Sequence, residues 1–531
     1  MAPCSNTKCQ QQPEPPFIYQ KPPSSSNTKE SFDNLNNIHQ SSPIITEDDT
    51  ESPEPPLQPV SPEEDIIFQL HPQRWFVLAS YCLLSLVCGS NWLCFPAVSN
   101  ILREYYQISI LSINMLSIVF GICLVLFSIP FALLLNKYGL AVVMQTSAFL
   151  NLTGALIKYF GDDADHGYWF LLCGNTFHAL SVAGFLFLPG DIASTWFGEH
   201  EAGKATSLCV AFDALGTGVG FLLATTIVQG NEDPYIVQGS IKQFLLSQLI
   251  PSVAVFLFVL LFVRRRPPHP PNFKELAIRR DEMFRKHVQL QYLLDIEQVL
   301  DRKGNVSEPV HVRRLPCIKQ HRILMSSLFK LIKNTDFQLI FHMQGIVASI
   351  EGLYEILLNE MLIDIFPGSE RAIGILGFVS VILGFTTNIL VGALIDKTGH
   401  YRRVSFIVFF LTTILASLWY IAIEYIHNFL AISIILSLLM SISTSYYTIA
   451  FAHGAQVADN VSASAIGVML VLTSQIYDTM SSFVATEILS SFGSSYVNGL
   501  AITLCVVATM LSFFVGNGDN KRTEVAAPAH V

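Results

Sequence analysis

The chain has 531 residues, of which 51% are hydrophobic and only 14% are charged, whereas soluble proteins average about 25% charged residues. This composition is typical of a polytopic membrane protein. The formal net charge of −10 says little about partners, because residues 1–74 alone hold 11 acidic and 4 basic side chains. Nothing supports nucleic-acid binding, and the 10 cysteines include no C-x-x-C pair that would indicate a zinc module.

The first 74 residues predict a disordered cytoplasmic tail. Of the 26 prolines, 13 lie before residue 75, among Ser, Asn, Gln and acidic residues. Such a mixture is too poor in apolar side chains to build a core. No apolar run lies near Met1, so we expect the first apolar span to direct membrane insertion in place of a signal peptide.

Windows of roughly 20 apolar residues predict twelve membrane-spanning helices in two halves of six, residues 75–263 and 337–515. The spans of the first half lie near residues 75–98, 112–135, 140–160, 168–190, 204–228 and 241–263. Those of the second half lie near residues 337–364, 372–395, 404–425, 429–454, 463–489 and 496–515. Residues 264–336 form a central loop between the halves, and residues 516–531 form a C-terminal tail.

The basic residues predict the orientation of the chain in the membrane, because Lys and Arg near span ends are retained on the cytoplasmic side. With both termini in the cytoplasm, the inner segments hold 27 of the 31 basic residues. Only four are left on the outside, Arg103, Lys158, Lys242 and Arg371. The sequence therefore predicts cytoplasmic tails and a cytoplasmic central loop.

The central loop contains apolar residues at mostly helical spacing between Phe273 and Gly304, interspersed with basic residues. This pattern favours a basic amphipathic helix on the inner membrane surface. A solvated linker helix is the alternative interpretation.

A short motif occurs in the loop after the second span of each half. The first copy contains Asn136, Lys137 and Gly139, and the second contains Gly392, Asp396, Lys397, Gly399 and Arg402. The pattern resembles the loop motif G-x-x-x-D-[RK]-x-G-x-[RK] of the major facilitator superfamily. The resemblance implies an all-α membrane protein with the major facilitator fold.

The motif suits a conformational switch. A carboxylate at the cytoplasmic helix ends can bind basic side chains and the positive end of a neighbouring helix, and these contacts break when the two halves rock. Asn136 replaces the acid in the first copy, so we expect a weaker contact there. A solvated loop with a turn glycine is the alternative.

Several segments resemble the feline leukaemia virus subgroup C receptor-related family, a major facilitator branch linked to haem, choline and ethanolamine transport. These segments are residues 91–100, Tyr105–Tyr106, residues 114–120, Thr195–Gly198 and Leu357–Met361. Pro267–Pro271 resembles the family's divergent lysosomal relative, disrupted in renal carcinoma protein 2, which is implicated in pyridoxine transport. The resemblance covers about residues 74–515.

The resemblance implies a role for particular residues. Trp92 matches a first-span tryptophan that packs on the choline ammonium group, although an interfacial anchor is the alternative for this residue. Gln475 matches an eleventh-span glutamine of the same cavity, and Tyr354 is the candidate for a seventh-span tyrosine. Ala214 stands where the family has a fifth-span glutamine, beside Asp213, and this departure leaves the substrate open.

Ionisable residues inside predicted spans indicate a cavity, because charges in hydrocarbon are costly and face a cavity or each other. Asp213, Glu351, Glu355 and Asp478 are such residues. Glu351 and Glu355 are four residues apart and so share a helix face, with Tyr354 beside them. Two acids on one face suit an organic cation or a proton relay, whereas capping of backbone groups or pairing with surface Lys and Arg is the alternative.

These observations predict a transporter and no enzyme. The sequence has no glycine-rich phosphate loop, and His342 and His453 have no ligand-spaced partner, so we expect neither cofactor nor metal. We expect alternating access between the two halves, facilitative or coupled to a proton or another ion. Choline or ethanolamine fits the acids and Trp92, haem and pyridoxine are alternatives, and a receptor or scaffold that does not transport is the alternative class. The membrane is expected to be the plasma membrane or the lysosomal membrane.

Overall fold

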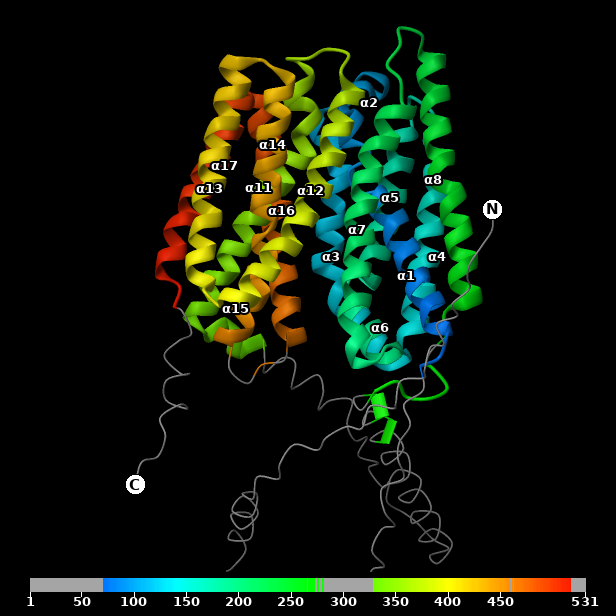
Figure 1. Ribbon diagram of the computed structural model, residues 1–531. Helices are drawn as coiled ribbons and strands as arrows, with labels where there is room; N and C mark the ends of the chain where they lie inside the picture. The colour runs from blue at the N-terminus through cyan, green and yellow to red at the C-terminus, as the bar shows by residue number, and fades with distance from the viewer. Residues whose placement is uncertain are drawn as a thin grey trace, which may run out of the picture. The chain divides into compact units, whose positions relative to one another are not determined.

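The computed structural model describes residues 70–264, 266–272, 275, 276, 279, 280, 328–458, 461 and 463–516, without the side chains of Asn136, Glu199, His200, Asp396, Ala463 and Ser464. Every regular element within these ranges is helical (Figure 1). The predicted N-terminal tail up to residue 69, most of the central loop and the C-terminal tail beyond Gly516 lie outside the described residues. The predicted amphipathic helix between Phe273 and Gly304 falls almost entirely there.

The first half contains the helices up to residue 262. They are α1 (Gln73–Ser90), the 3-10 helix η2 (Pro96–Val98), α2 (Ser99–Tyr106), α3 (Ile110–Tyr138), α4 (Leu140–Lys158), α5 (Gly167–Phe185), α6 (Pro189–Trp196), α7 (Glu199–Ile227) and α8 (Pro234–Phe262).

The second half begins at residue 335. Its helices are α11 (Thr335–Ile363), α12 (Glu370–Thr398), α13 (Tyr401–Ile421), the π-helix η3 (Ala422–Ile426), α14 (Phe429–Thr444), α15 (Tyr446–Val457), α16 (Ala463–Phe492) and α17 (Ser494–Phe514).

The helices correspond to the predicted spans in order and confirm an all-α membrane protein. Among the described residues, 8 helical segments are long and apolar enough to cross a membrane, or 9 if the bent pair α5 and α6 counts as one span. Hydropathy and length alone therefore support fewer than twelve spans. Three helices that match predicted spans, α1, α11 and α16, are not apolar enough or not long enough to count as membrane-spanning by this measure. Helix α11 illustrates the reason, because it carries four acidic residues among its 29.

The predicted first span, residues 75–98, differs from the structure. Helix α1 ends at Ser90, residues 91–95 are not helical, and η2 begins at Pro96. The cause is local. Gly89, Ser90 and Asn91 are poor helix formers, and Pro96 has no N–H to bond the carbonyl of Trp92.

Helices α1 and α7 pack with their backbones in close approach. A Cβ atom on Gly216 would lie 2.5 Å from the carbonyl oxygen of Leu86, and one on Gly220 would lie 2.6 Å from that of Ser90. Larger residues at these two positions would force the helices apart. Small residues at helix interfaces are common in membranes, where close packing replaces the hydrophobic effect.

The two halves meet through α3 with α16 and through α7 with α12. We call the end of the bundle that contains α2 the α2 end, and the opposite end, which contains α6 and α15, the α6 end. At the α2 end, Asn359 of α11 donates hydrogen bonds to Ser99 (3.0 Å) and Asn100 (2.8 Å), and Asn100 donates to Glu370 of α12 (3.0 Å). Polar contacts therefore join the halves at the α2 end.

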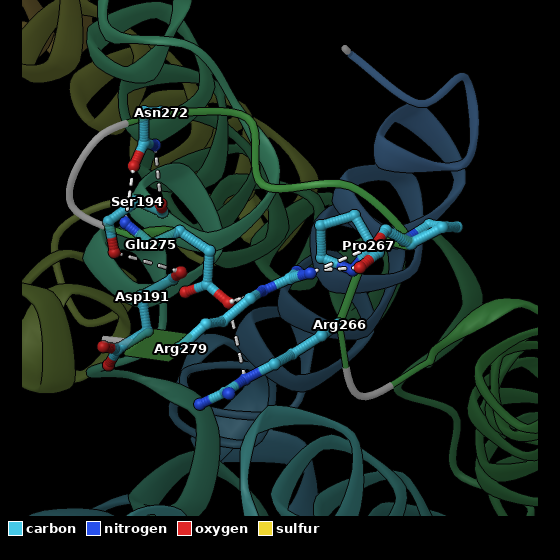
Figure 2. A network of polar contacts seen from close by, with 8 residues as sticks. Asp191, Ser194, Arg266, Pro267, Asn272, Glu275 and Arg279 are labelled. Atoms are coloured by element: carbon cyan, nitrogen blue, oxygen red, sulfur yellow. Dashed lines mark hydrogen bonds and ion pairs between the residues drawn. The ribbon is translucent and has the colours of Figure 1, made fainter. Parts of the chain in front are cut away.

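The chain that follows α8 returns to α6 at the α6 end (Figure 2). The Asn272 amide donates to the carbonyl oxygens of Ser194 (2.8 Å) and Phe197 (2.9 Å), at the C-terminal end of α6. Its side-chain oxygen accepts from the N–H of Glu275 at 2.8 Å. These bonds fasten the start of the predicted central loop to the first half.

A buried carboxylate holds the same segment together. Glu275, whose side chain is 3% exposed, lies 3.0 Å from Arg279 and 3.5 Å from Arg266. Arg279 also donates to the carbonyl oxygens of Pro267 (2.8 Å) and Pro268 (3.1 Å). We call Arg264, residues 266–272, Glu275 and Arg279 the loop clamp.

Candidate functional site

Trp92 lies in the non-helical segment between α1 and η2. Its carbonyl oxygen accepts a hydrogen bond from the Ser117 hydroxyl of α3. The half-buried ring packs against an apolar group from α3 and α5 that contains Phe120, Cys123 and Ala179. The Trp92 backbone is thus held, and the residue is only partly buried. A cation that binds an aromatic side chain lies over the face of its ring.

Asp213 lies on α7, where this helix packs on α1. Its side chain is half-buried, and Oδ1 accepts a hydrogen bond from the Ser85 hydroxyl at 2.9 Å. A hydroxyl group satisfies part of the carboxylate's hydrogen-bonding capacity but does not neutralise its charge.

Glu351 extends from α11 toward hydroxyl groups of α14 and α15. Its Oε1 accepts a hydrogen bond from Ser443 at 3.4 Å, and the hydroxyl groups of Thr444 and Tyr447 lie near the same carboxyl group. Hydroxyl groups can orient a carboxylate, but they leave its charge available to a bound cation.

Asp478 of α16 lies beside Glu351 and packs over a glycine of α11. Its Oδ1 accepts from Ser482 at 3.2 Å, and it interacts electrostatically with both Glu351 and Glu355. A Cβ atom on Gly352 would collide with the Asp478 carboxylate. Gly352 therefore lets three carboxyl groups from two helices gather, and we call Glu351, Glu355 and Asp478 the acidic cluster.

Whereas Glu351 faces Ser443, Tyr354 of α11 faces α13 and α17. Its hydroxyl donates to Asn498 of α17 at 3.4 Å, and its ring meets Trp419 of α13 edge to face, with centroids 5.9 Å apart. Tyr354 and Glu355 also line a pocket of about 10 Å³ with Phe221 of α7 and Ser380 of α12. Such a volume is about that needed by one water molecule.

Gln475 lies on the side of α16 that faces α3. Its main-chain carbonyl oxygen would be 3.5 Å from a Cβ atom on Gly121 of α3. The predicted binding residues thus fall into two groups, with Trp92 and Asp213 in the first half and the others in the second. Within the part of the chain that the structure describes, no group of three or more His, Cys, Asp or Glu side chains is placed to hold a metal ion.

The repeated loop motif forms helix ends. Gly139 ends α3 with φ +86° and Gly399 ends α12 with φ +63°, and glycine adopts positive φ without strain. Gly392 lies inside α12, before the end of the helix at Gly399. An added Cβ atom there would be 3.1 Å from Thr448. The exposed side chains of Lys137 and Lys397 lie in the last turns.

The charged part of the motif is only partly described. Arg402 donates a hydrogen bond to the carbonyl oxygen of Phe513, in the last turn of α17, which is a favourable place for a cation. The side chains of Asn136 and Asp396 lie outside the described residues. The expected switch therefore stays a prediction.

Sequence reasoning missed Lys158. The distribution of basic residues predicts that Lys158 lies on the outside, yet it is 1% exposed and its Nζ donates to Oδ1 of Asn91 at 2.6 Å. A lysine at the end of a predicted span is usually a surface residue. Gly174 of α5, which admits the Lys158 side chain, is a signal that a single sequence does not reveal.

The family model of the Major Facilitator Superfamily matches residues 81–475. The chain belongs to this family, and it is therefore a membrane transporter and not an enzyme.

Relatives resemble the chain over most of its length. Choline/ethanolamine transporter FLVCR2 of Rattus norvegicus is 24% identical over 469 residues, which is 88% of this chain and 79% of the relative. An uncharacterised MFS-type transporter of Caenorhabditis elegans is 23% identical over 460 residues, 87% of this chain and 72% of the relative.

Solved structures share the fold. A bacterial homologue of the human lysosomal transporter Spinster superposes with a TM-score of 0.63 at 12% identity, covering 84% of this chain and 98% of the other. At this identity the likeness concerns the fold alone.

Proposed function

We propose that this transporter moves a small organic cation, with choline or ethanolamine as the first candidates, by alternating access between its two halves. The observation that carries the proposal is the acidic cluster, in which α11 and α16 bring Glu351, Glu355 and Asp478 together. The hydrogen-bond partners of Glu351 and Asp478 are hydroxyl groups. An intramembrane carboxylate held in this way suits a cationic substrate or a coupling proton.

Trp92 supports an ammonium substrate in particular. An accessible tryptophan face attracts a desolvated cation by roughly 0.5 to 2 kcal/mol. The relatives named as choline/ethanolamine transporters agree with this chemistry. Substrate contact with Asp213 and Gln475 is part of the same proposal. Asp213 lies on α7, which packs against α12 of the other half, and Gln475 lies on α16, which packs against α3 of the other half.

The orientation and the membrane are also proposals. The distribution of basic residues supports a cytoplasmic location for the α6 end and both termini, and we infer either the plasma membrane or the lysosomal membrane. Epitope tags at residues 20, 290 and 525 should bind antibody only after permeabilisation of cells that carry the protein at the surface. Labelling of the tag at residue 290 in intact cells would contradict this orientation.

Uptake and efflux of labelled choline, ethanolamine, pyridoxine and haem by expressing cells test the substrate. We expect transport of choline or ethanolamine, with loss of activity in Glu351→Gln and full activity in the control Glu232→Gln, an exposed loop residue. Transport of haem or pyridoxine alone would contradict the cation proposal. Absence of transport for all four in correctly targeted protein would favour a receptor or scaffold.

A further inference from the structure

Lys158, the last residue of α4, is buried in the first half without a carboxylate partner among the residues that the structure describes. Its side chain is 1% exposed, and Nζ lies 2.6 Å from Oδ1 of Asn91 and 5.3 Å from the ring centroid of Phe95. Lysine is almost never fully buried unless it is paired. A buried amine that binds one amide oxygen and one aromatic face therefore calls for an explanation.

The two partners of Lys158 flank Trp92 in the break between α1 and η2. The Asn91 amide donates back to the Val87 carbonyl at 2.7 Å, so Asn91 connects the last turn of α1 to α4. Residues 91–95 keep only local backbone bonds, such as those from Asn91 to Cys88 and from Trp92 to Gly89. Bonds from neighbouring helices add to these.

Other helices hold the same segment at different points. The Cys94 thiol donates to the Asn91 carbonyl, and Gln248 of α8 donates to the Cys94 sulfur, both at 3.4 Å. Ser117 of α3 bonds the Trp92 carbonyl. Among these bonds, the one from Lys158 is a short hydrogen bond from an amine, and charge-assisted hydrogen bonds are roughly twice as strong as neutral ones.

Helix α5 makes room for this arrangement. A Cβ atom on Gly174 would collide with Cγ of Lys158, so the lysine stem fits only because position 174 has no side chain. The Lys158 side chain is thus built into the contact between α4 and α5, and its amine is aimed at the break in the first span.

We propose that Lys158 is a positioning residue that holds Asn91, and through it Trp92, in the geometry that binds substrate. The proposal rests on the proposed function of Trp92. A positive charge would repel an organic cation, so Lys158 acts through Asn91 and does not contact the substrate itself. Removal of the amine should loosen Asn91 and change the orientation of the Trp92 ring, while the other bonds keep the segment in place.

The orientation of Trp92 can be followed without any substrate. In protein labelled with 5-fluorotryptophan, the fluorine resonance of Trp92 is assigned by its loss in Trp92→Phe. We expect Lys158→Met, which keeps the length of the side chain, to shift or broaden that resonance and to leave that of Trp75 unchanged. The control Lys242→Met removes an exposed amine that binds Asp162 at 3.0 Å, and it should shift nothing at Trp92. An unchanged Trp92 resonance in folded Lys158→Met would overturn the proposal.

Transport kinetics then test the coupling between the two residues. At equal surface expression, Lys158→Met should raise the apparent KM for choline at least threefold in the wild-type background and leave it unchanged in the Trp92→Ala background. An equal fold-change in both backgrounds would mean a general effect on the fold and would overturn positioning through Trp92. If Trp92→Ala itself leaves KM unchanged, the proposed binding site fails, whereas the fluorine result still decides the role of Lys158.

Asn91→Asp guards against a Lys158 variant that does not fold. It keeps an oxygen that accepts from Lys158 but loses the N–H that donates to the Val87 carbonyl. If the Lys158 bond positions Trp92, the Trp92 resonance and KM should be retained. A displaced Trp92 resonance in Asn91→Asp with normal folding would assign the positioning to the Val87 bond and contradict the role given to Lys158.

Discussion

The guanidinium group of Arg103 lies 3.5 Å from the carboxylate of Glu360, and this ion pair joins the two halves of the transporter at the α2 end. The Glu360 side chain is 7% exposed and that of Arg103 is 45% exposed, so solvent screens the pair from one side. Asn359, the neighbour of Glu360, bonds Ser99 and Asn100 in the other half. Any conformation that opens the α2 end must break these contacts.

Arg103→Ala should therefore favour a conformation in which the α2 end is open. A partly exposed ion pair contributes roughly 0.2 to 1 kcal/mol, which corresponds to at most about a fivefold change in the ratio of the two conformations. Distances between spin labels at residues 104 and 364 would report the change. Arg371→Ala, which removes an exposed arginine at the start of α12, is the control, and equal distance distributions in both variants would contradict the expectation.

Replacement of Trp92 should weaken binding in proportion to the loss of its aromatic face. Trp92→Phe keeps a weaker face and should raise the apparent KM for choline modestly. Trp92→Ala should cost about 1 to 2 kcal/mol, or roughly five- to thirtyfold in affinity. Trp169→Ala, at an exposed ring of α5, should leave KM unchanged, and wild-type KM in Trp92→Ala would refute the stacking role.

Gly352→Ala should disrupt the acidic cluster. The added methyl group would occupy the place of the Asp478 carboxylate, so Asp478 must move away from Glu351 or the two helices must separate. We expect a lower melting temperature and reduced transport. Gly239→Ala of α8 is a matched control, because a Cβ atom there meets nothing within 4 Å and alanine favours a helix over glycine by about 1 kcal/mol. Equal behaviour of the two variants would show that Asp478 has room to adjust.

Glu275→Gln should loosen the loop clamp. The amide keeps the shape but cannot neutralise Arg266 and Arg279, and a buried ion pair that loses one charge leaves the other uncompensated. Trypsin should then cut after Arg279 several-fold faster than in the wild-type protein, whereas the bond after Arg266 is resistant because Pro267 follows it. Glu232→Gln provides the control for a carboxylate outside the clamp. Cleavage at the wild-type rate in Glu275→Gln would mean that Asn272 holds the segment without the ion pairs.

The repeated motif predicts an asymmetric switch. Asp396→Ala should impair transport more than Asn136→Ala at matched expression, because only the second copy of the motif has an acidic residue that brings a full charge. Transport rates of the two variants provide the measurement. A larger loss in Asn136→Ala would place the switch in the first half instead.

The sequence predicts the helices well because their signal is local. The span predicted at 112–135 is α3 (Ile110–Tyr138), and the one predicted at 372–395 is α12 (Glu370–Thr398). Apolar runs of this length have no alternative in a membrane but to form helices, since their backbone groups must be bonded internally. The break after Ser90 was not predicted, because the apolar character of the first span continues through Leu93, Cys94 and Phe95.

The candidate site depends on tertiary contacts that no single helix reveals. Helical spacing alone predicts that Glu351 and Glu355 share a face. The approach of Asp478 requires both the register of α16 against α11 and the absence of a side chain at Gly352. The burial of Lys158 also depends on tertiary contacts. Whether a lysine at a helix end faces water or the interior is decided by the helices packed beside it.

The loop clamp affects the order in which the protein can assemble during synthesis. Every residue that takes part in it, from Asn272 with Ser194 to Glu275 with Arg266 and Arg279, belongs to the first 279 residues of the chain. Polypeptides generally fold from the N-terminal domain onward as they leave the ribosome. The first half can therefore make its last internal bonds before the first helix of the second half, which begins at Thr335, has been translated. A nascent chain stalled just before Thr335 and already inserted in the membrane, with the clamp residues clear of the ribosome, should have its clamp closed.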